Sequence, residues 1–409
     1  MIQQFSRTHV TKGTVLVLSS LVGYFFNFLF NAYLGRVLSL EQFALIALLT
    51  SIWYIIIIVL NALSASVNHE VAYIHKKDGE NEAFSYYSFF SSKTTVFSVI
   101  LAVLWIILTP FLVSFFHLEN IFVIVMFAPL IILGALTSVK RGYLQATLSF
   151  TFLAITVLVE SISRFLLAVV FVQSGNPNEA YLSLPLSIIL GFIISWYLVR
   201  KYHGVHTDKK NYAFPRHFFL IMLLTNISST AFLTIDMVLV KHYFSTLLAG
   251  TYALLALIGK IIYFLGTLLN SILFTVISRK REQGTALFYY FLLGTSFILF
   301  LSFVVFGLLG TTVTPILFGD KVVAIFPYLF NYTLGMCVFT LSSVFVLFHL
   351  VLKHYSFAAI SSGMAVALSL GIIMFHSTLL QIVNTILIVS LAGFGVIVAL
   401  HLKRRNQLL

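Results

Sequence analysis

The sequence predicts an all-α polytopic membrane protein with about twelve transmembrane helices arranged as two six-helix bundles. Its 409 residues are 60% hydrophobic and only 9% charged, whereas soluble domains carry about 25% charged residues. Apolar runs of roughly 20 residues, the length of a membrane-crossing helix, recur along the whole chain. A transmembrane barrel would instead show short segments of alternating hydrophobicity. These observations place the chain in a bilayer.

The twelve expected spans follow from these apolar runs. The first run has a basic start like that of a signal peptide, but it is long and lacks a small-residue cleavage site, so we expect a retained first span. The eighth and tenth runs exceed what a bilayer needs and are expected to tilt or to extend past the interface. Prolines predict bends at positions 110, 129, 185 and 327. The expected spans cover residues 13–34, 42–64, 94–116, 121–138, 148–172, 181–199, 217–239, 246–274, 286–309, 322–350, 355–375 and 379–402.

The distribution of basic residues predicts the orientation. With the N-terminus inside, the outside segments hold only Arg36, Lys241 and Lys321 of the 24 Lys and Arg, and two more lie within spans. The positive-inside rule then predicts that both termini are cytoplasmic. The net charge of +12 is accordingly assigned to orientation and to contact with anionic membrane lipids, not to nucleic acid. We expect a multi-pass protein of the cytoplasmic (inner) membrane.

The most polar internal segment predicts the domain organisation. The sequence RKYHGVHTDKKNYAFPRH between spans six and seven predicts a cytoplasmic linker at 201–216, which joins a six-helix bundle at 1–200 to a second one at 217–409. A second charged loop is expected at 69–93, and its start could continue the preceding helix. Six spans per half would relate the two halves as a parallel repeat, with a cavity between them.

Several chemistries lack their sequence signatures. Cys337 is the single cysteine, so an internal disulfide and a multi-cysteine metal site are excluded. The twelve histidines show no ligand spacing, and no phosphate-binding glycine loop is present. We expect no metal, no organic cofactor and no enzymatic activity, because the outside loops are too short to carry catalytic groups.

Four ionisable acids and bases fall within the expected spans, namely Glu160, Arg164, Asp236 and Lys260. A charge at the bilayer centre costs about 3 kcal/mol on insertion scales, so such residues face a bundle interior or a watery cavity. Glu160 and Arg164 are four residues apart and share one helix face. This pair either fixes helix packing by neutralising itself or holds the Arg164 guanidinium for a phosphate.

The other two charges allow similar alternatives. Asp236 lies toward the outer end of its span, where it could be interfacial or could pair with Lys241. Lys260 is nearer the middle of its span and is interpreted as a cation that faces a cavity. Arg36 and Glu41 are expected to form a surface pair at the outer corner.

The first span of each half is unusually polar. Asn27 and Asn31 lie in span one, and Asn226 lies in span seven beside Ser228, Ser229 and Thr230. These groups either line a cavity or form hydrogen bonds between helices, worth about 0.6 kcal/mol each.

Three blocks of sequence resemble the oligosaccharide flippase family. The first is VKRGYLQATLSFTFLAITVLVESISRFLLAV, the second is YLGRVLSLEQFALIALLTSI, and the third is TIDMVLVKHYFSTLLAGTYALLALIGKII. They occur in the family's order. The residues that match the family pattern in the first and third blocks are Arg141, Gly142, Gln145, Glu160, Arg164, Asp236, Gly250, Tyr252 and Lys260.

The resemblance implies a member of the multidrug/oligosaccharidyl-lipid/polysaccharide (MOP) exporter superfamily. The expected activity is movement of a polyprenyl-diphosphate-linked oligosaccharide from the cytoplasmic to the outer leaflet by alternating access. Arg164 and Lys260 would then bind the diphosphate, while Glu160 and Asp236 balance charge or carry a coupling proton or sodium ion. Asn27, Asn31 and Asn226 would serve the sugar hydroxyls. Expected partners are the lipid-linked oligosaccharide, membrane lipids, and a polysaccharide polymerase or glycosyltransferases.

Two other functions fit the same spans. A multidrug or metabolite antiporter of the superfamily would favour an acidic cavity, whereas two bases here accompany two acids. A non-transporting membrane scaffold for polysaccharide assembly would tolerate apolar replacement of these charges. The lipid II flippase branch usually carries additional spans, which this chain lacks.

Overall fold

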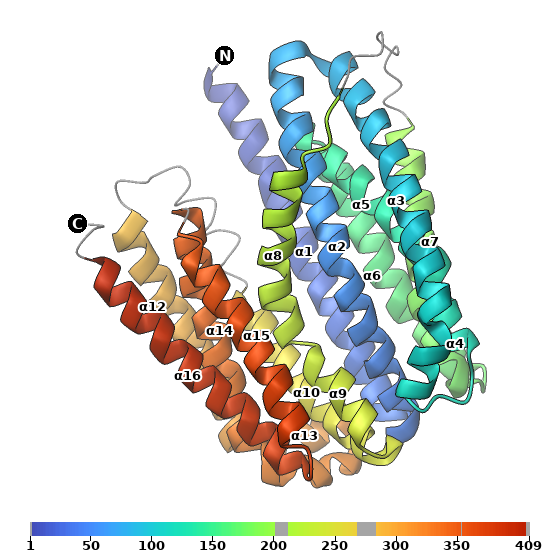
Figure 1. The fold of residues 1–409 in the computed structure, drawn as a ribbon, viewed down its shortest axis with the longest axis vertical. Helices are drawn as coiled ribbons and strands as arrows, with labels where there is room; N and C mark the ends of the chain where they lie inside the picture. The colour runs from blue at the N-terminus through green and yellow to red at the C-terminus, as the bar shows by residue number, and fades with distance from the viewer. Residues whose placement is uncertain (1, 201–211, 268–283, 353, 406–409) are drawn as a thin grey trace. The chain divides into compact units, whose positions relative to one another are not determined.

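The computed structural model describes residues 2–200, 212–267, 284–352 and 354–405 (Figure 1). These ranges form helices joined by turns and contain no β-strand. Ten helical segments in them are long and apolar enough to cross a membrane, so the predicted all-α polytopic fold is confirmed. The two other predicted spans fall on α1 (Ile2–Val37) and on α8 (Arg216–Phe232) with α9 (Ile235–Tyr243).

The chain divides into two compact units. Unit 1 comprises residues 1–30 and 56–226, and unit 2 comprises residues 31–55 and 227–409. Helices α1, α2 (Leu40–Asp78) and α8 each contribute residues to both units. The predicted division into halves at the 201–216 linker stays a prediction, because residues 201–211 lie outside the described part of the chain.

In unit 1, two long helix pairs pack side by side. Helix α3 (Glu80–Phe115) packs along α5 (Phe127–Ala146), and α6 (Phe150–Gln173) packs along α7 (Ser183–Val199), which also contacts α5. Short elements lead into two of these helices, namely α4 (Phe122–Val125) and a 3₁₀ segment (Pro177–Leu182). The turn between α5 and α6 is tight, with Leu148 at φ 56°.

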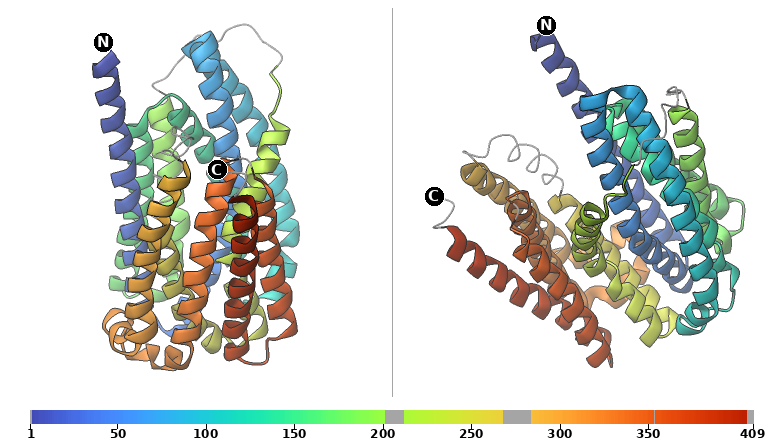
Figure 2. Two further views of the ribbon diagram at one scale, coloured as in Figure 1. Left: turned by 90° about the vertical axis from the view of Figure 1, so that its left-hand side faces the viewer. Right: turned by 45° about the horizontal axis from the view of Figure 1, so that its top comes forward.

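In unit 2, α14 (Leu329–Val351) is the central helix. It packs against four neighbours, which Figures 1 and 2 show around it, namely α10 (Thr246–Thr267), α12 (Gly284–Phe303), α15 (Ser356–Met374) and α16 (Leu379–Arg405). A π-helical turn (Val304–Leu308), α13 (Gly310–Phe318) and a 3₁₀ segment (Asp320–Tyr328) connect α12 to α14.

The charged loop predicted at 69–93 is instead helical. Helix α2 continues to Asp78 and α3 begins at Glu80, with a single break at Gly79, whose φ is 90°. At ~1.5 Å per residue, the 39 residues of α2 extend well past a hydrocarbon core of about 30 Å. Glu, Lys and Ala are good helix formers, so the charges end the apolar run but do not end the helix.

The long span predicted at 322–350 is two segments. Its first residues belong to the 3₁₀ segment that contains Pro327, and α14 begins two residues later at Leu329. Proline lacks the backbone N–H that an α-helical interior needs. Pro129 and Pro185 lie in the first turn of α5 and α7, where that donor is not required, and α3 continues through Pro110.

Exposed apolar stripes mark helix faces suited to lipid. On α3, Val96, Val99, Val103, Ile107 and Phe111 recur every three or four residues, and each exposes at least 43% of its surface. A water-soluble protein rarely exposes a continuous apolar face of this length. This stripe therefore supports the placement of α3 in a bilayer.

Candidate functional site

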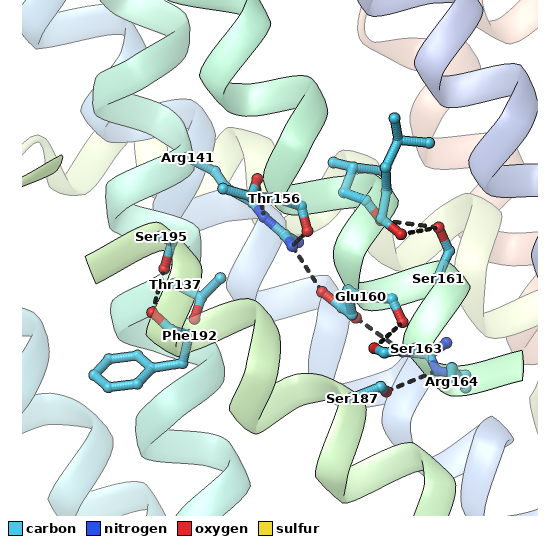
Figure 3. Close-up of polar contacts among 12 residues, drawn as sticks. Thr137, Arg141, Thr156, Glu160, Ser161, Ser163, Arg164, Ser187, Phe192 and Ser195 are labelled. Atoms are coloured by element: carbon cyan, nitrogen blue, oxygen red, sulfur yellow. Dashed lines mark hydrogen bonds and ion pairs between the residues drawn. The ribbon is translucent and has the colours of Figure 1, made fainter. Parts of the chain in front are cut away.

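Glu160 lies between two arginines in unit 1 (Figure 3). Its Oε2 atom is 2.7 Å from Nη2 of Arg141, and its Oε1 atom is 2.8 Å from Nη2 of Arg164. One carboxylate therefore faces two guanidinium groups, which gives these three side chains a net positive charge. Ion pairs with charged hydrogen-bond donors are among the strongest polar contacts in proteins.

The α5–α6 hairpin brings Arg141 to Glu160. Arg141 and Thr156 are at similar distances from the turn at Leu148, so antiparallel packing places them side by side. The Arg141 Nε atom donates to Oγ1 of Thr156 at 3.2 Å, and Nη2 donates to the Thr156 carbonyl at 3.1 Å. Glu160 lies one helical turn beyond Thr156, within reach of the same guanidinium.

Arg164 is held by three helices. Besides its bond to Glu160 on α6, its Nε atom donates to Oγ of Ser187 on α7 at 3.1 Å. Its Nη1 atom donates to Oδ1 of Asn27 on α1 at 3.2 Å. The residue is only 9% exposed. This geometry gives Arg164 a clear packing role, and Asn27 is part of it.

Two glycines allow the helices around this cluster to approach closely. A Cβ atom at Gly191 on α7 would lie 3.3 Å from Oε2 of Glu160. A Cβ atom at Gly142, next to Arg141, would lie 2.5 Å from the backbone oxygen of Ser64 on α2. The absence of side chains at these positions therefore helps to set the position of Glu160.

In unit 2, Lys260 on α10 is the in-span cation without a carboxylate partner in the described residues. Its Nζ atom lies 3.4 Å from Oγ of Ser51, a long hydrogen bond, and 5.5 Å from the centre of the Tyr54 ring. Both neighbours come from α2. A cation–π contact recovers part of the lost hydration of this half-buried ammonium group, and Asp236 acts on it electrostatically without forming an ion pair.

Asp236 is bound to a tyrosine and not to Lys241. The Tyr252 hydroxyl donates to Oδ2 of Asp236 at 2.7 Å, and the Met237 backbone N–H donates to Oδ1 at 2.7 Å. Lys241 instead donates to Oγ1 of Thr246 at 3.3 Å. The Asp236–Lys241 alternative is therefore wrong, because Asp236 in the first turn of α9 is turned toward α10. Asp236 is 3% exposed, so its carboxylate is buried within the protein.

The predicted outer-corner pair is also not formed. Arg36 is at the end of α1, and its Nη1 atom donates to the backbone oxygen of Ile316 on α13 at 3.0 Å. The ion pairs among the described residues do not include Arg36 and Glu41. A backbone oxygen of α13, a helix that the hydropathy pattern does not predict, thus takes the place of the nearby Glu41 carboxylate.

The predicted site residues belong to both units. Asn27, Glu160 and Arg164 come together in unit 1, whereas Asn31 and Lys260 belong to unit 2. Asn226 is half-buried near the end of unit 1, and its Nδ2 atom donates to the Met222 carbonyl of its own helix. The predicted roles of these residues in substrate binding stay predictions.

Sequence reasoning missed several contributors to these sites. Arg141 was matched to a family motif, but its contact with Glu160 was not foreseen. Ser187, Gly191 and Tyr54 were not singled out, and each lies on a helix other than that of its charged neighbour. The described residues contain no group of three His, Cys, Asp or Glu side chains that could hold a metal ion.

Comparison with known proteins shows the family and the fold of this chain. Residues 33–327 match the family model described as "Polysaccharide biosynthesis protein". No curated protein matches significantly. Solved structures with the same fold include an inward-facing multidrug resistance MATE family transporter of the MOP superfamily, with a TM-score of 0.73 and 12% identity over 94% of this chain and 96% of that one.

A second similar structure is the lipid II flippase MurJ in an inward closed conformation. Its TM-score is 0.74, with 17% identity over 95% of this chain and 87% of that one. At such identities the similarity establishes the fold and not the substrate. The predicted MATE-like fold is confirmed.

Proposed function

Because this chain belongs to the polysaccharide biosynthesis protein family, we propose that it is a flippase for a polyprenyl-diphosphate-linked oligosaccharide and not an enzyme. It would move this lipid from the cytoplasmic to the outer leaflet of the cytoplasmic membrane by alternating access, with both termini in the cytoplasm. Two known structures of this fold are a transporter and a lipid flippase, which supports the transport class.

Lys260 is the observation that carries the proposal. A half-buried ammonium group that forms no ion pair with a carboxylate among the described residues is costly in a membrane protein. A diphosphate would supply a negative charge at contact distance and would accept charge-assisted hydrogen bonds. Ser51 and Tyr54 lie against the same ammonium group, and they could contact the phosphate oxygens or the first sugar.

The unit 1 cluster supports an anionic substrate in a different way. Glu160 neutralises one of its two arginines, so a positive charge remains. Arg164 is enclosed by Glu160, Ser187 and Asn27, whereas the Arg141 side chain is 23% exposed. We propose that the cluster attracts the diphosphate through its net charge, and that Arg141 is the arginine better placed to meet it.

Charge balance and coupling complete the proposal. Glu160 and Asp236 are proposed to offset the cations when no substrate is bound, and either could carry a coupling proton or sodium ion. Asn27, Asn31 and Asn226 are proposed to serve sugar hydroxyls. Membrane lipids and a polysaccharide polymerase or glycosyltransferases are the proposed partners, because a flipped precursor needs enzymes that make it and consume it.

The test is a flipping assay in proteoliposomes that contain a polyprenyl-diphosphate-linked oligosaccharide. Its appearance in the far leaflet is followed with a membrane-impermeant oxidant of sugars. Lys260→Met keeps the side-chain length but removes the charge, and we expect flipping to fall by at least about tenfold, the loss of one charge-assisted contact. Lys260→Arg should retain part of the activity.

Lys241→Met is the matched control. Lys241 is also buried in unit 2 but is bound to Thr246 at a helix end, so its replacement should leave flipping near the wild-type rate. Equal flipping by Lys260→Met and the wild type would refute the assignment of Lys260. If the protein exchanges cationic drugs but moves no lipid-linked sugar, it is an antiporter; if it moves neither, the scaffold function is favoured.

A further inference from the structure

A row of hydrogen-bonded rings lies at one end of unit 2. The Tyr289 hydroxyl is 3.1 Å from Nε2 of His401, and Nδ1 of His401 is 2.9 Å from Nε2 of His349. The Nδ1 atom of His349 is in turn 3.1 Å from Nδ1 of His354. Four side chains from α12, α14, α16 and the α14–α15 connection thus form one continuous row, which we call the histidine chain.

The histidine chain is held in place by backbone and ring contacts. The His354 N–H donates to the His349 carbonyl at 2.8 Å, which folds the end of α14 back on itself. The Phe357 ring stacks on His349 with 3.6 Å between centroids and an angle of 4°. His349 is fully buried and His401 is 3% exposed. The central two imidazoles are therefore fixed inside an apolar environment.

Besides the three imidazoles, two titratable or charged residues among those that the structure describes act on the histidine chain. Tyr289 faces it from α12, and Arg404 on α16 acts electrostatically on His349 and His354. Helix α15 contributes the apolar Phe357 ring. Burial, followed by the positive charge of Arg404, lowers the pKa of His354 from its usual value. The surroundings therefore favour a neutral His354 imidazole at neutral pH.

The geometry limits how many hydrogens the histidine chain can hold. A contact between two imidazole nitrogens needs one hydrogen, because two hydrogens would repel and none would leave two lone pairs facing each other. Three neutral imidazoles satisfy both nitrogen–nitrogen contacts in either of two directions. In one direction, the Tyr289 hydroxyl donates to His401, His401 donates to His349, and His349 donates to His354. In the other direction, His354 donates to His349, His349 donates to His401, and His401 donates to the Tyr289 oxygen.

One extra proton also fits. With one hydrogen in each nitrogen–nitrogen contact, the remaining two hydrogens occupy the two ends of the row, Nε2 of His401 and Nε2 of His354. The Tyr289 oxygen then accepts from His401. A second added proton would place two hydrogens in one nitrogen–nitrogen contact and break the row. The charge can move between rings, because each shift of a hydrogen across a contact of about 3 Å reverses one bond.

We propose that Tyr289, His401, His349 and His354 form a proton-binding site that takes up one proton and shares it along the row. The ligand is a proton and not a metal ion. His349 directs its two nitrogens at two different neighbours, so the three imidazoles do not converge on one point. The described residues accordingly contain no metal-binding group of three such side chains.

The test counts protons taken up by the purified full-length protein in detergent. The weakly buffered sample is brought from about pH 8 to pH 5, a range that spans the usual imidazole pKa of about 6.5. Proton uptake is compared between wild type and single His→Gln variants. His75→Gln, a change at an exposed residue of α2, is the control for replacement of a histidine outside the row.

The proposal makes an unusual pair of predictions. His354→Gln leaves two linked imidazoles, which still hold one extra proton, so uptake should stay the same. His349→Gln removes the central ring and separates His401 from His354, so each can take its own proton and uptake should rise by about one. Independent histidines would instead lose about one proton in each variant, and silent histidines would show no change in either.

Unchanged uptake in His354→Gln together with increased uptake in His349→Gln supports the shared site. A loss of about one proton in each variant, or no change in either, overturns it. If His349→Gln does not fold, His349→Asn serves in the same experiment, because it also separates His401 from His354 and should raise uptake by about one proton. His401→Gln leaves His349 and His354 linked, so uptake should be unchanged, and a loss of about one proton in it or in His354→Gln overturns the proposal.

Discussion

The Arg141 guanidinium and the Glu160 carboxylate lie 2.7 Å apart, although 19 residues separate them in the sequence. Because Arg164 binds the other oxygen of the same carboxylate, Glu160 is shared by two cations. The Glu160–Arg164 pair that the helical spacing predicts would be neutral by itself, whereas the observed cluster with Arg141 keeps a positive charge. The stability of unit 1 should therefore depend on Glu160 more than on either arginine.

We expect Glu160→Gln to lower the unfolding free energy by about 2 kcal/mol. Breaking a fully buried pair costs about 3–5 kcal/mol, and exposed pairs contribute less than about 1 kcal/mol. The Glu160 side chain is 18% exposed, so an intermediate value applies. The amide keeps the shape of the side chain, so the loss reports on charge. The apparent melting temperature in detergent measures it.

Glu41→Gln is the control for this measurement. Glu41 is exposed in the first turn of α2, and the ion pairs of the described residues do not include it. Its replacement should change the melting temperature little. If the two variants melt at the same temperature, Glu160 does not hold the arginines together.

The helical fold and most spans could be predicted because apolar length alone determines what a bilayer accepts. The ends of the helices could not be predicted in this way, because charged residues that favour helix at 69–93 extend α2 and α3 beyond the apolar runs. Short elements such as α13 also escaped prediction. They lie between spans, and their contacts, such as that of Ile316 with Arg36, come from distant helices.

The site was predictable within a helix and unpredictable between helices. The spacing of Glu160 and Arg164 gave their contact directly. The contacts of Glu160 with Arg141 and of Asp236 with Tyr252 depend on how neighbouring helices align. Both residues of each pair belong to the family motifs, which was the only indication in the sequence. A motif does not show, however, which of its side chains contact each other.

Gly191→Ala should destabilise unit 1 by about 1–3 kcal/mol, the usual range for an overpacked site. Its new Cβ atom would lie 3.3 Å from Oε2 and 3.5 Å from Cβ of Glu160, so the carboxylate must shift away from Arg141. Melting in detergent measures the effect. Gly395→Ala on α16 is the matched control, since no atom lies within 4 Å of its added Cβ.

The control should be neutral or slightly stabilising, because alanine favours a helix by up to about 1 kcal/mol over glycine. A Gly191→Ala protein as stable as Gly395→Ala would mean that Glu160 moves at no cost. In that case Gly191 does not position the carboxylate.

Tyr212→Phe should change the response of stability to alkaline pH. The Tyr212 hydroxyl donates to Oε1 of Glu82 at 2.5 Å, and burial together with this bond raises the pKa of Tyr212 to about 12. A tyrosine ionises near pH 10 when unfolded, so the folded state holds its proton more tightly. This contribution is full below about pH 10 and is lost as the pH rises toward 12.

Melting curves across this range test the sign. The wild type should lose stability more steeply with pH than Tyr212→Phe does. Tyr73→Phe, which changes an exposed tyrosine of α2, controls for the loss of a hydroxyl. Parallel curves for all three proteins would show that the Tyr212–Glu82 bond does not resist ionisation.

Tyr252→Phe tests how far Asp236 depends on its tyrosine. The change removes the hydroxyl that donates to Oδ2 of Asp236, but it keeps the ring that packs edge-on to Tyr332. Asp236 is 3% exposed, so water cannot readily replace the lost donor. A hydrogen bond to a charged group contributes about 1.5–3 kcal/mol, and we expect a loss of stability in this range.

An Asp236→Asn background separates this bond from general packing. A neutral amide depends less on the hydroxyl, so Tyr252→Phe should cost clearly less in that background, and the difference measures the coupling between the two residues. Tyr290→Phe, at an exposed position of α12, controls for the loss of a hydroxyl. Equal costs in both backgrounds would mean that Tyr252 supports α10 through its ring and that the Asp236 carboxylate is held by its backbone contact with Met237.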